Sequence, residues 1–233
     1  MYIDITYIVL VLPFVLIAMW ASINVNSTFK RYSKQFSMRR ITGAQAAQRV
    51  LSANGVTGVR IERVSGDLTD HYDPRTNVIR LSESVYDSTS TAAIGVACHE
   101  AGHAVQYAQS YGPIKLRAAI IPATNIGCHL ALPLIILGLI LSAFSFHSYW
   151  LVYAGIACFS LSLVFQLITL PVEFNASRRA IRAIEDGNIL TEEETRGAKK
   201  VLRAAALTYV AAAAVALMQL LRLIMLFGGR RKN

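Results

Sequence analysis

The sequence predicts a mainly α-helical membrane protein with four transmembrane helices and a small polar α+β segment. Apolar residues make up 54% of the 233-residue chain and charged residues only 16%, which is not the balance of a soluble globular protein. Three stretches contain no Asp, Glu, Lys or Arg: Ile5 to Phe29, Ala118 to Val172, and Ala204 to Leu221. Because a helical span needs about 20 mostly apolar residues, the first and last stretches each supply one span. The middle stretch, with 55 residues, supplies two.

These stretches give the expected order of segments along the chain. We expect transmembrane helix 1 at 1–29, a polar segment at 30–117, transmembrane helices 2 and 3 at 118–172, polar helices at 173–203, transmembrane helix 4 at 204–227 and a basic tail at 228–233. Helices 2 and 3 are expected to join near Phe144 to Trp150, where aromatic residues suit a membrane interface. No basic region precedes the first span, which therefore reads as an anchor rather than a cleavable signal.

Basic residues indicate which ends of the spans face the cytoplasm. The stretches from Lys30 to Arg117 and from Arg178 to Arg203 contain 19 of the 23 Lys and Arg residues. Because Lys and Arg are enriched in cytoplasmic loops, we expect both stretches in the cytoplasm and the N-terminus outside. Contact with lipid headgroups accounts for the net charge of +9, so no nucleic-acid partner is expected. The three cysteines include no close pair and predict neither a disulfide framework nor a thiolate zinc site.

The polar segment begins with a helix and two strands. The helix is expected to start with Thr42 and Gln45 as a capping box and to stop at Gly55. Val59 to Ser65 and Val78 to Ser82 alternate apolar and polar residues on either side of a turn-rich run, which predicts a β-hairpin. The second strand is either an edge that pairs with an extended peptide or an ordinary hairpin strand.

The next helix carries the pattern H-E-x-x-H. The run from Ala92 to Gln109 reads as helix, and residues four apart on a helix project from one face, so His99 and His103 can reach one metal ion. In this pattern two imidazoles bind zinc, and the glutamate, here Glu100, takes a proton from the attacking water. We therefore expect 30–117 to be a zincin-like cytoplasmic segment. A structural histidine pair on an ordinary helix is the alternative.

A catalytic zinc ion needs a third protein ligand. Gln106 and Gln109 stand where a metzincin has Gly and His, so that class is excluded. The carboxylates after His103 are Glu173, Glu185, Asp186, Glu192, Glu193 and Glu194. Glu173 directly follows the 55 uncharged residues, where a charge without a partner is costly. Two spans separate it from His103, so both residues are expected at the same side of the membrane. Glu173 is therefore the expected ligand in a gluzincin-type site for one Zn²⁺ ion; the alternatives are an ion pair with Arg178 or contact with headgroup water.

The two ligand motifs also carry a family resemblance. "ACHEAGHAVQ", followed two spans later by "EFNASRRA", resembles the YugP-like family of neutral zinc metallopeptidases of bacterial membranes. The likeness runs from about Arg39 to Leu221 and includes Leu68 to Tyr86. More distantly, the chain is similar to HtpX-type membrane zinc proteases, which share H-E-x-x-H and a later E-[FY]-x-A-D motif.

The resemblance implies zinc-dependent hydrolysis of unfolded, misfolded or membrane-associated polypeptides at the bacterial cell membrane. It implies a catalytic base and three zinc ligands, which here are Glu100 and then His99, His103 and Glu173. Ser177 stands where the HtpX-type motif has Asp, and we expect Asn175, Ser177 or a further residue that the sequence does not identify to orient a histidine ligand. His71, in "DHYDP", is either a donor to the substrate or the oxyanion, or a structural turn histidine.

The predicted function is thus that of a membrane zinc metalloendopeptidase with its active site at the cytoplasmic surface. The rival hypothesis is a non-enzymatic zinc-binding membrane scaffold or regulator. A lipid or small-amide hydrolase would use the same ligands. Neither the physiological substrate nor an oligomeric state is predicted.

Overall fold

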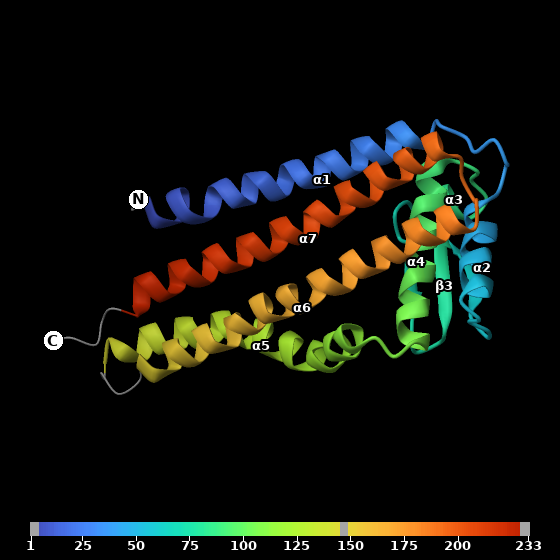
Figure 1. The fold of residues 1–233 in the computed structure, drawn as a ribbon. Coiled ribbons are helices and arrows are strands. Elements are labelled where there is room, and N and C mark those ends of the chain that lie inside the picture. Colours follow the sequence, from blue (N-terminus) through green and yellow to red (C-terminus); the bar gives the residue numbers. More distant parts are fainter. Residues whose placement is uncertain (1–4, 145–148, 229–233) are drawn as a thin grey trace. The chain divides into compact units, whose positions relative to one another are not determined.

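The structure, a computed structural model, describes residues 5–144 and 149–228 and is mainly helical (Figure 1). The helical elements are a short π-helical turn at Tyr7–Val11, α1 at Leu12–Tyr32, α2 at Gly43–Ala53, α3 at Glu83–Tyr86, α4 at Thr91–Ala108, α5 at Gly112–Ser142, α6 at Trp150–Asp186 and α7 at Glu192–Phe227. Four stretches are long and apolar enough to cross a membrane, namely Tyr7–Tyr32, Gly112–Ser142, Trp150–Asp186 and Glu192–Phe227. The expected mainly helical protein with four candidate spans is confirmed.

The chain divides into two compact units. The first comprises Met1–Trp20, Leu116–Leu170 and Tyr209–Asn233; the second comprises Ala21–Lys115 and Pro171–Thr208. The second unit contains α2, α3, α4, the strands and the polar ends of the four long helices. Residues 145–148 of the expected aromatic join and 229–233 of the expected basic tail lie outside the described residues.

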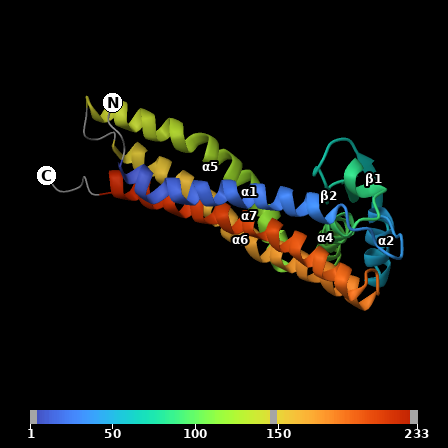
Figure 2. The ribbon, with the colours of Figure 1, turned by 90° about the horizontal axis from the view of Figure 1, so that it is seen from above.

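Within the first unit α5 lies beside α6 and α1 beside α7 (Figures 1 and 2), and α7 also packs against α5 and α6 through Leu223. A Cβ atom at Gly155 of α6 would lie 2.7 Å from the carbonyl oxygen of Ala131 on α5. Small residues permit this close approach where lipid provides no hydrophobic driving force between helices. In the other pair, the Arg222 guanidinium lies 5.4 Å from the centroid of the Tyr7 ring.

The sheet in the second unit has three strands: β1 at Arg60–Val64, β2 at His71–Asp73 and β3 at Val78–Ser82. Their order is β1-β3-β2, with β3 parallel to β1 and antiparallel to β2. The predicted hairpin between the first and last of these strands is therefore wrong. Of the two alternatives for 78–82, the edge strand is excluded because β3 is central, and the structure has a hairpin strand whose hairpin partner is β2. The turn formers at 74–77 close a shorter hairpin between β2 and β3, because Asn77 adopts φ 55° directly before β3. An alternating pattern predicts a strand but does not name its partner.

The core of the second unit gathers α2, β3 and α4. Its fully buried members include Ala46, Ala47, Val50 and Leu51 of α2, Ile79 and Leu81 of β3, and Ala93, Ile94, Ala97, Cys98 and Ala101 of α4. The expected capping box at the start of α2 is present: Gln45 N–H donates to Thr42 Oγ1 at 3.2 Å, and Thr42 N–H donates to Gln45 Oε1 at 3.1 Å. This core fixes α4, the helix that carries H-E-x-x-H.

Candidate metal centre

Helix α4 passes through the middle of the second unit's core. It begins where the Ala93 N–H donates to the Ser90 side chain at 3.2 Å, so Ser90 is its N-cap. Most of its residues are buried, and many of those are Ala or Gly. These small side chains let neighbouring elements pack closely against the helix from several sides. His99 and His103, four residues apart, project from the same face of the helix.

Helix α6 meets α4 at a glycine. A Cβ atom at Gly102 would lie 2.9 Å from the carbonyl oxygen of Ala176, so the two backbones approach more closely than any other residue would allow. Along α6, buried Val172, Glu173, Ala176 and Ala180 recur at helical spacing and form the inner face. This packing brings Glu173 to the two histidines.

The three expected ligands form one cluster. Nε2 of His99 lies 3.2 Å from Oε2 of Glu173, and Nε2 of His103 lies 3.5 Å from the same oxygen. One ligand atom from each residue lies within 4.8 Å of the others, and Glu173 is only 3% exposed. Tetrahedral zinc, with bonds of about 2.0–2.2 Å, holds its ligand atoms about 3.3–3.6 Å apart, which is close to the two distances from the histidines to Glu173. Arg178 forms no ion pair within the described part of the chain, so the alternative partner for Glu173 is not seen.

A buried glutamine fixes the orientation of His103. Nδ1 of His103 lies 3.0 Å from Oε1 of Gln106, whose Nε2 donates to the Val172 carbonyl at 2.8 Å and to Asn175 Oδ1 at 3.0 Å. Asn175 Oδ1 also accepts from Arg179 Nε at 2.7 Å. A backbone carbonyl can only accept and an arginine can only donate, so the glutamine must present its oxygen to the ring. Nδ1 of His103 therefore carries a proton, and Nε2 is the nitrogen available to a metal.

His99 has a different partner. Its Nδ1 lies 3.1 Å from the hydroxyl oxygen of Ser177, one turn beyond Glu173 on α6. A hydroxyl can donate or accept, so Ser177 suits either tautomer; with a metal on Nε2, Nδ1–H of His99 would donate to it. Of the two residues expected to orient a ligand, Ser177 thus contacts His99 directly, whereas Asn175 contacts His103 only through Gln106.

Gln106 is the residue that the sequence interpretation missed. Sequence reasoning used it only to exclude the metzincin class. The available signal was its position: it lies three residues after His103 on the same helical face, where a polar side chain in a buried helix must find a hydrogen-bond partner. Its relative exposure is 0%.

Neighbouring carboxylates control the protonation of His103. Burial by itself lowers the pKa of His103, but the hydrogen bond that His103 donates to Glu173 and the charges of Glu100 and Glu173 outweigh it. The resulting pKa lies above its ordinary value. A proton on Nδ1 of His103 meets Gln106, and a proton on Nε2 would meet Glu173.

Asp70, in "DHYDP", interacts electrostatically with Glu100 of α4. Burial raises the pKa of Asp70, and the charge of Glu100 raises it further. Its carboxylate accepts hydrogen bonds from the backbone N–H of Ser82 at 2.7 Å and from the Ser82 hydroxyl at 3.0 Å. These bonds hold Asp70 at the end of β3 nearest the start of α3.

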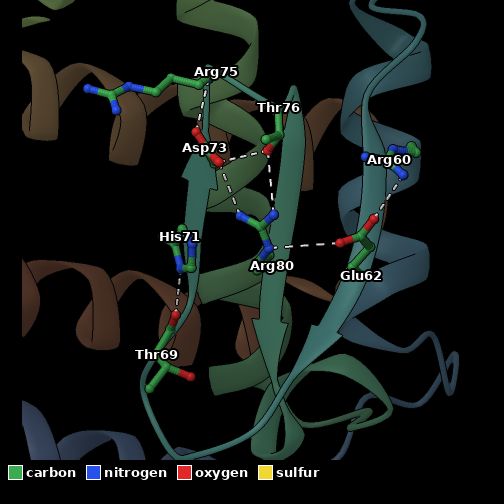
Figure 3. Close-up of polar contacts among 8 residues, drawn as sticks. All are labelled: Arg60, Glu62, Thr69, His71, Asp73, Arg75, Thr76 and Arg80. Carbon is green, nitrogen blue, oxygen red and sulfur yellow. Dashed lines mark hydrogen bonds and ion pairs between the residues drawn. The ribbon is translucent and has the colours of Figure 1, made fainter.

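His71 lies on the opposite face of the sheet from α4. Its Nδ1–H donates to the Thr69 carbonyl at 2.8 Å, and it is in register with Arg80 (Figure 3). The next residue, Tyr72, points the other way, and its ring contacts Tyr107 of α4 at 5.6 Å between centroids. Among the described residues no hydrogen bond or ion pair joins His71 to the ligand cluster.

The same face of the sheet carries a polar ladder across its three strands. Arg80 on the central strand reaches Asp73 of β2, with 3.2 Å between Nη1 and Oδ2, and Glu62 of β1, with 3.8 Å between Nε and Oε2 (Figure 3). Cross-strand charge pairs of this kind stabilise pairing. The pairs that Arg80 makes therefore help to hold the three strands together.

Known proteins match the chain over almost its whole length. The sequence profile of a family described as "Putative neutral zinc metallopeptidase" matches residues 7–228. The "Putative membrane protease YugP" of Bacillus subtilis (strain 168) is 47% identical over 218 residues, which cover 93% of this chain and 95% of that protein. No solved structure matches. Because the family profile and the relative agree over nearly the full chain, the protein belongs to this family of neutral zinc metallopeptidases.

Proposed function

We propose that this protein is a membrane zinc metalloendopeptidase of the gluzincin type, with one Zn²⁺ ion held by His99, His103 and Glu173. The observation that carries the proposal is the cluster of three ligand atoms within 4.8 Å, drawn from two helices. The partners of the two Nδ1 atoms support it, because each leaves Nε2 facing the cluster. Membership of a zinc metallopeptidase family supports it independently.

The chemistry follows from the residues around the cluster. Zinc bound there would polarise the substrate carbonyl and lower the pKa of a water molecule. Glu100, the neighbour of His99 on α4, would accept the proton of the attacking water and return it to the leaving nitrogen. Gln106 would keep the His103 imidazole in one tautomer, and Ser177 would hold the orientation of the His99 ring.

The number of ligands favours catalysis over the scaffold hypothesis. A structural zinc site fills all four positions with protein ligands, whereas a catalytic site keeps one open. In the described part of the chain the cluster offers three ligand residues. A non-enzymatic scaffold would also not need a proton acceptor such as Glu100 next to the first ligand, His99.

We propose that the site faces the cytoplasm and that the N-terminus lies outside. Of the 23 Lys and Arg residues, 18 belong to the second unit, eleven of them at 21–115 and seven at 171–208. The positive-inside rule places such a unit in the cytoplasm. In this arrangement 30–117 and 173–203 are the cytoplasmic segments, and the substrates are membrane-associated or unfolded polypeptides of the bacterial cell membrane.

Metal removal tests the proposal. Protein in nanodiscs should cleave an unfolded polypeptide, lose this activity after treatment with a chelator, and regain it with one equivalent of zinc. Glu173→Ala should weaken zinc binding at least a hundredfold, because it removes one of three ligands. Glu185→Ala is the matched control, since that exposed carboxylate pairs with Lys199 at 2.6 Å. Equal zinc affinity in the two variants would show that Glu173 is not a ligand.

A further inference from the structure

A cavity of about 460 Å³ lies between α2, α4 and α6 of the second unit, apart from the metal ligands. Its lining includes Asn175, Arg178, Arg179, Arg182 and Asp186, all on α6. The charged members are three arginines and one aspartate, which gives the lining a net charge of +2. Such a cavity favours an anion.

The three arginines are not neutralised by the protein itself. Within the described part of the chain, none of Arg178, Arg179 and Arg182 forms an ion pair, although Asp186 lines the same cavity. Arg178 and Arg182 lie four residues apart, where like charges on one helix face repel each other. A bound anion would remove that repulsion.

One of the arginines is already fixed in position. Arg179 donates from Nε to Asn175 Oδ1 at 2.7 Å and from Nη1 to Gln109 Oε1 at 2.6 Å, and its guanidinium lies 6.0 Å from the centroid of the Tyr111 ring. These bonds use two of the five N–H donors that an arginine has. The rest can meet a ligand without loss of side-chain freedom, because the guanidinium is held in place.

We propose that this cavity is a phosphate-binding site, with Arg178, Arg179 and Arg182 as its donors. Three guanidinium groups supply more donors than the two oxygens of a carboxylate can accept, whereas a phosphate monoester offers three strong acceptor oxygens. The arginines lie 6 to 10 residues beyond Val172, the last residue of the uncharged run, so α6 carries them about 9–15 Å past that point. At that level the phosphate can come from a lipid headgroup or from solution. The site is separate from the zinc ligands and does not depend on peptidase activity.

Titration of zinc-free protein with inorganic phosphate tests the site. In nanodiscs of phosphatidylcholine, the wild-type protein should bind phosphate, and Arg182→Gln should weaken binding about tenfold or more, because it removes hydrogen bonds between charged groups. Arg203→Gln is the matched control, an exposed arginine of α7 outside the cavity, and should bind as the wild type does. Equal helix content in both variants, measured by circular dichroism, shows that neither is misfolded. The absence of phosphate binding, or equal losses in the two variants, would overturn the proposal.

A second arm of the titration identifies the source of the phosphate. Phosphatidic acid, whose headgroup is a phosphate monoester, is added to the nanodiscs and should weaken the apparent phosphate affinity of the wild-type protein if a lipid headgroup occupies the cavity. An unchanged affinity would assign the cavity to soluble phosphate. Either result supports the site, provided that Arg182→Gln removes the binding.

Discussion

Replacing Gln106 with leucine tests whether the geometry of the metal centre depends on the partner of His103. Leucine has a similar size but no polar atom. The substitution therefore removes the acceptor for Nδ1–H of His103 and both donors to Val172 and Asn175. The ring of His103 would then be free to rotate or to change tautomer.

The structure gives the size of the effect. Three hydrogen bonds of 3.0, 2.8 and 3.0 Å are lost in a fully buried position. At a net value of about 0.5–1.5 kcal/mol each, the metal-free protein should lose about 2–4 kcal/mol of stability. Loss of the partner that orients a zinc ligand typically weakens metal affinity about 10–100-fold.

The assay measures the zinc dissociation constant by competition with a chelating dye, together with the thermal midpoint of the zinc-free protein. Gln48→Leu is the matched control, because Gln48 is exposed on α2 and makes only a 3.4 Å bond to the Ser52 hydroxyl. We expect Gln106→Leu to bind zinc at least tenfold more weakly and the control to bind as the wild type does. A zinc affinity in Gln106→Leu within about twofold of the wild type would refute the role assigned to this residue.

Three further predictions concern the same centre. Gly102→Ala should weaken zinc binding about tenfold, measured by competition with a chelator. The new Cβ would lie 2.9 Å from the Ala176 carbonyl oxygen and would displace α6. An unchanged zinc affinity would contradict the importance of this close packing. Ser177→Ala should also lower zinc affinity about tenfold. Ser177→Asp should bind zinc as tightly as the wild type or more tightly, because a carboxylate is a stronger acceptor for His99 Nδ1–H. Tighter zinc binding by Ser177→Ala than by Ser177→Asp would exclude this contact. The pKa of His103 is raised, and a proton on its Nε2 competes with zinc. The zinc affinity should therefore be highest above that pKa and should fall as the pH drops through it. Calorimetry in buffers of different ionisation enthalpy should detect the released proton, and a result independent of buffer would contradict the assignment.

The sequence was sufficient to predict the four candidate spans and the proximity of His99, His103 and Glu173. Spans are visible because lipid excludes charge over about 20 residues, and this signal does not depend on tertiary contacts. The pairing of His99 with His103 follows from helical periodicity alone. Glu173 followed from the even number of spans, a topological argument that needs no distances.

The remaining features depend on contacts that the sequence does not encode locally. The alternation in Val59 to Ser65 and in Val78 to Ser82 predicted strands, but the partner of each depends on how 65–70 crosses the sheet. Gln106 could have been suspected from its position after His103, yet its role depends on Val172 and Asn175, more than sixty residues away.

The most direct test of the account is Glu100→Gln, with zinc content and peptide cleavage measured on the same preparation. The variant keeps the shape of the side chain and all three proposed ligands, but an amide cannot accept the proton of the attacking water. We predict about one zinc ion per chain, as in the wild type, and a cleavage rate lower by a factor of about 10²–10⁴. A variant that binds zinc and cleaves polypeptide at the wild-type rate would contradict the central claim.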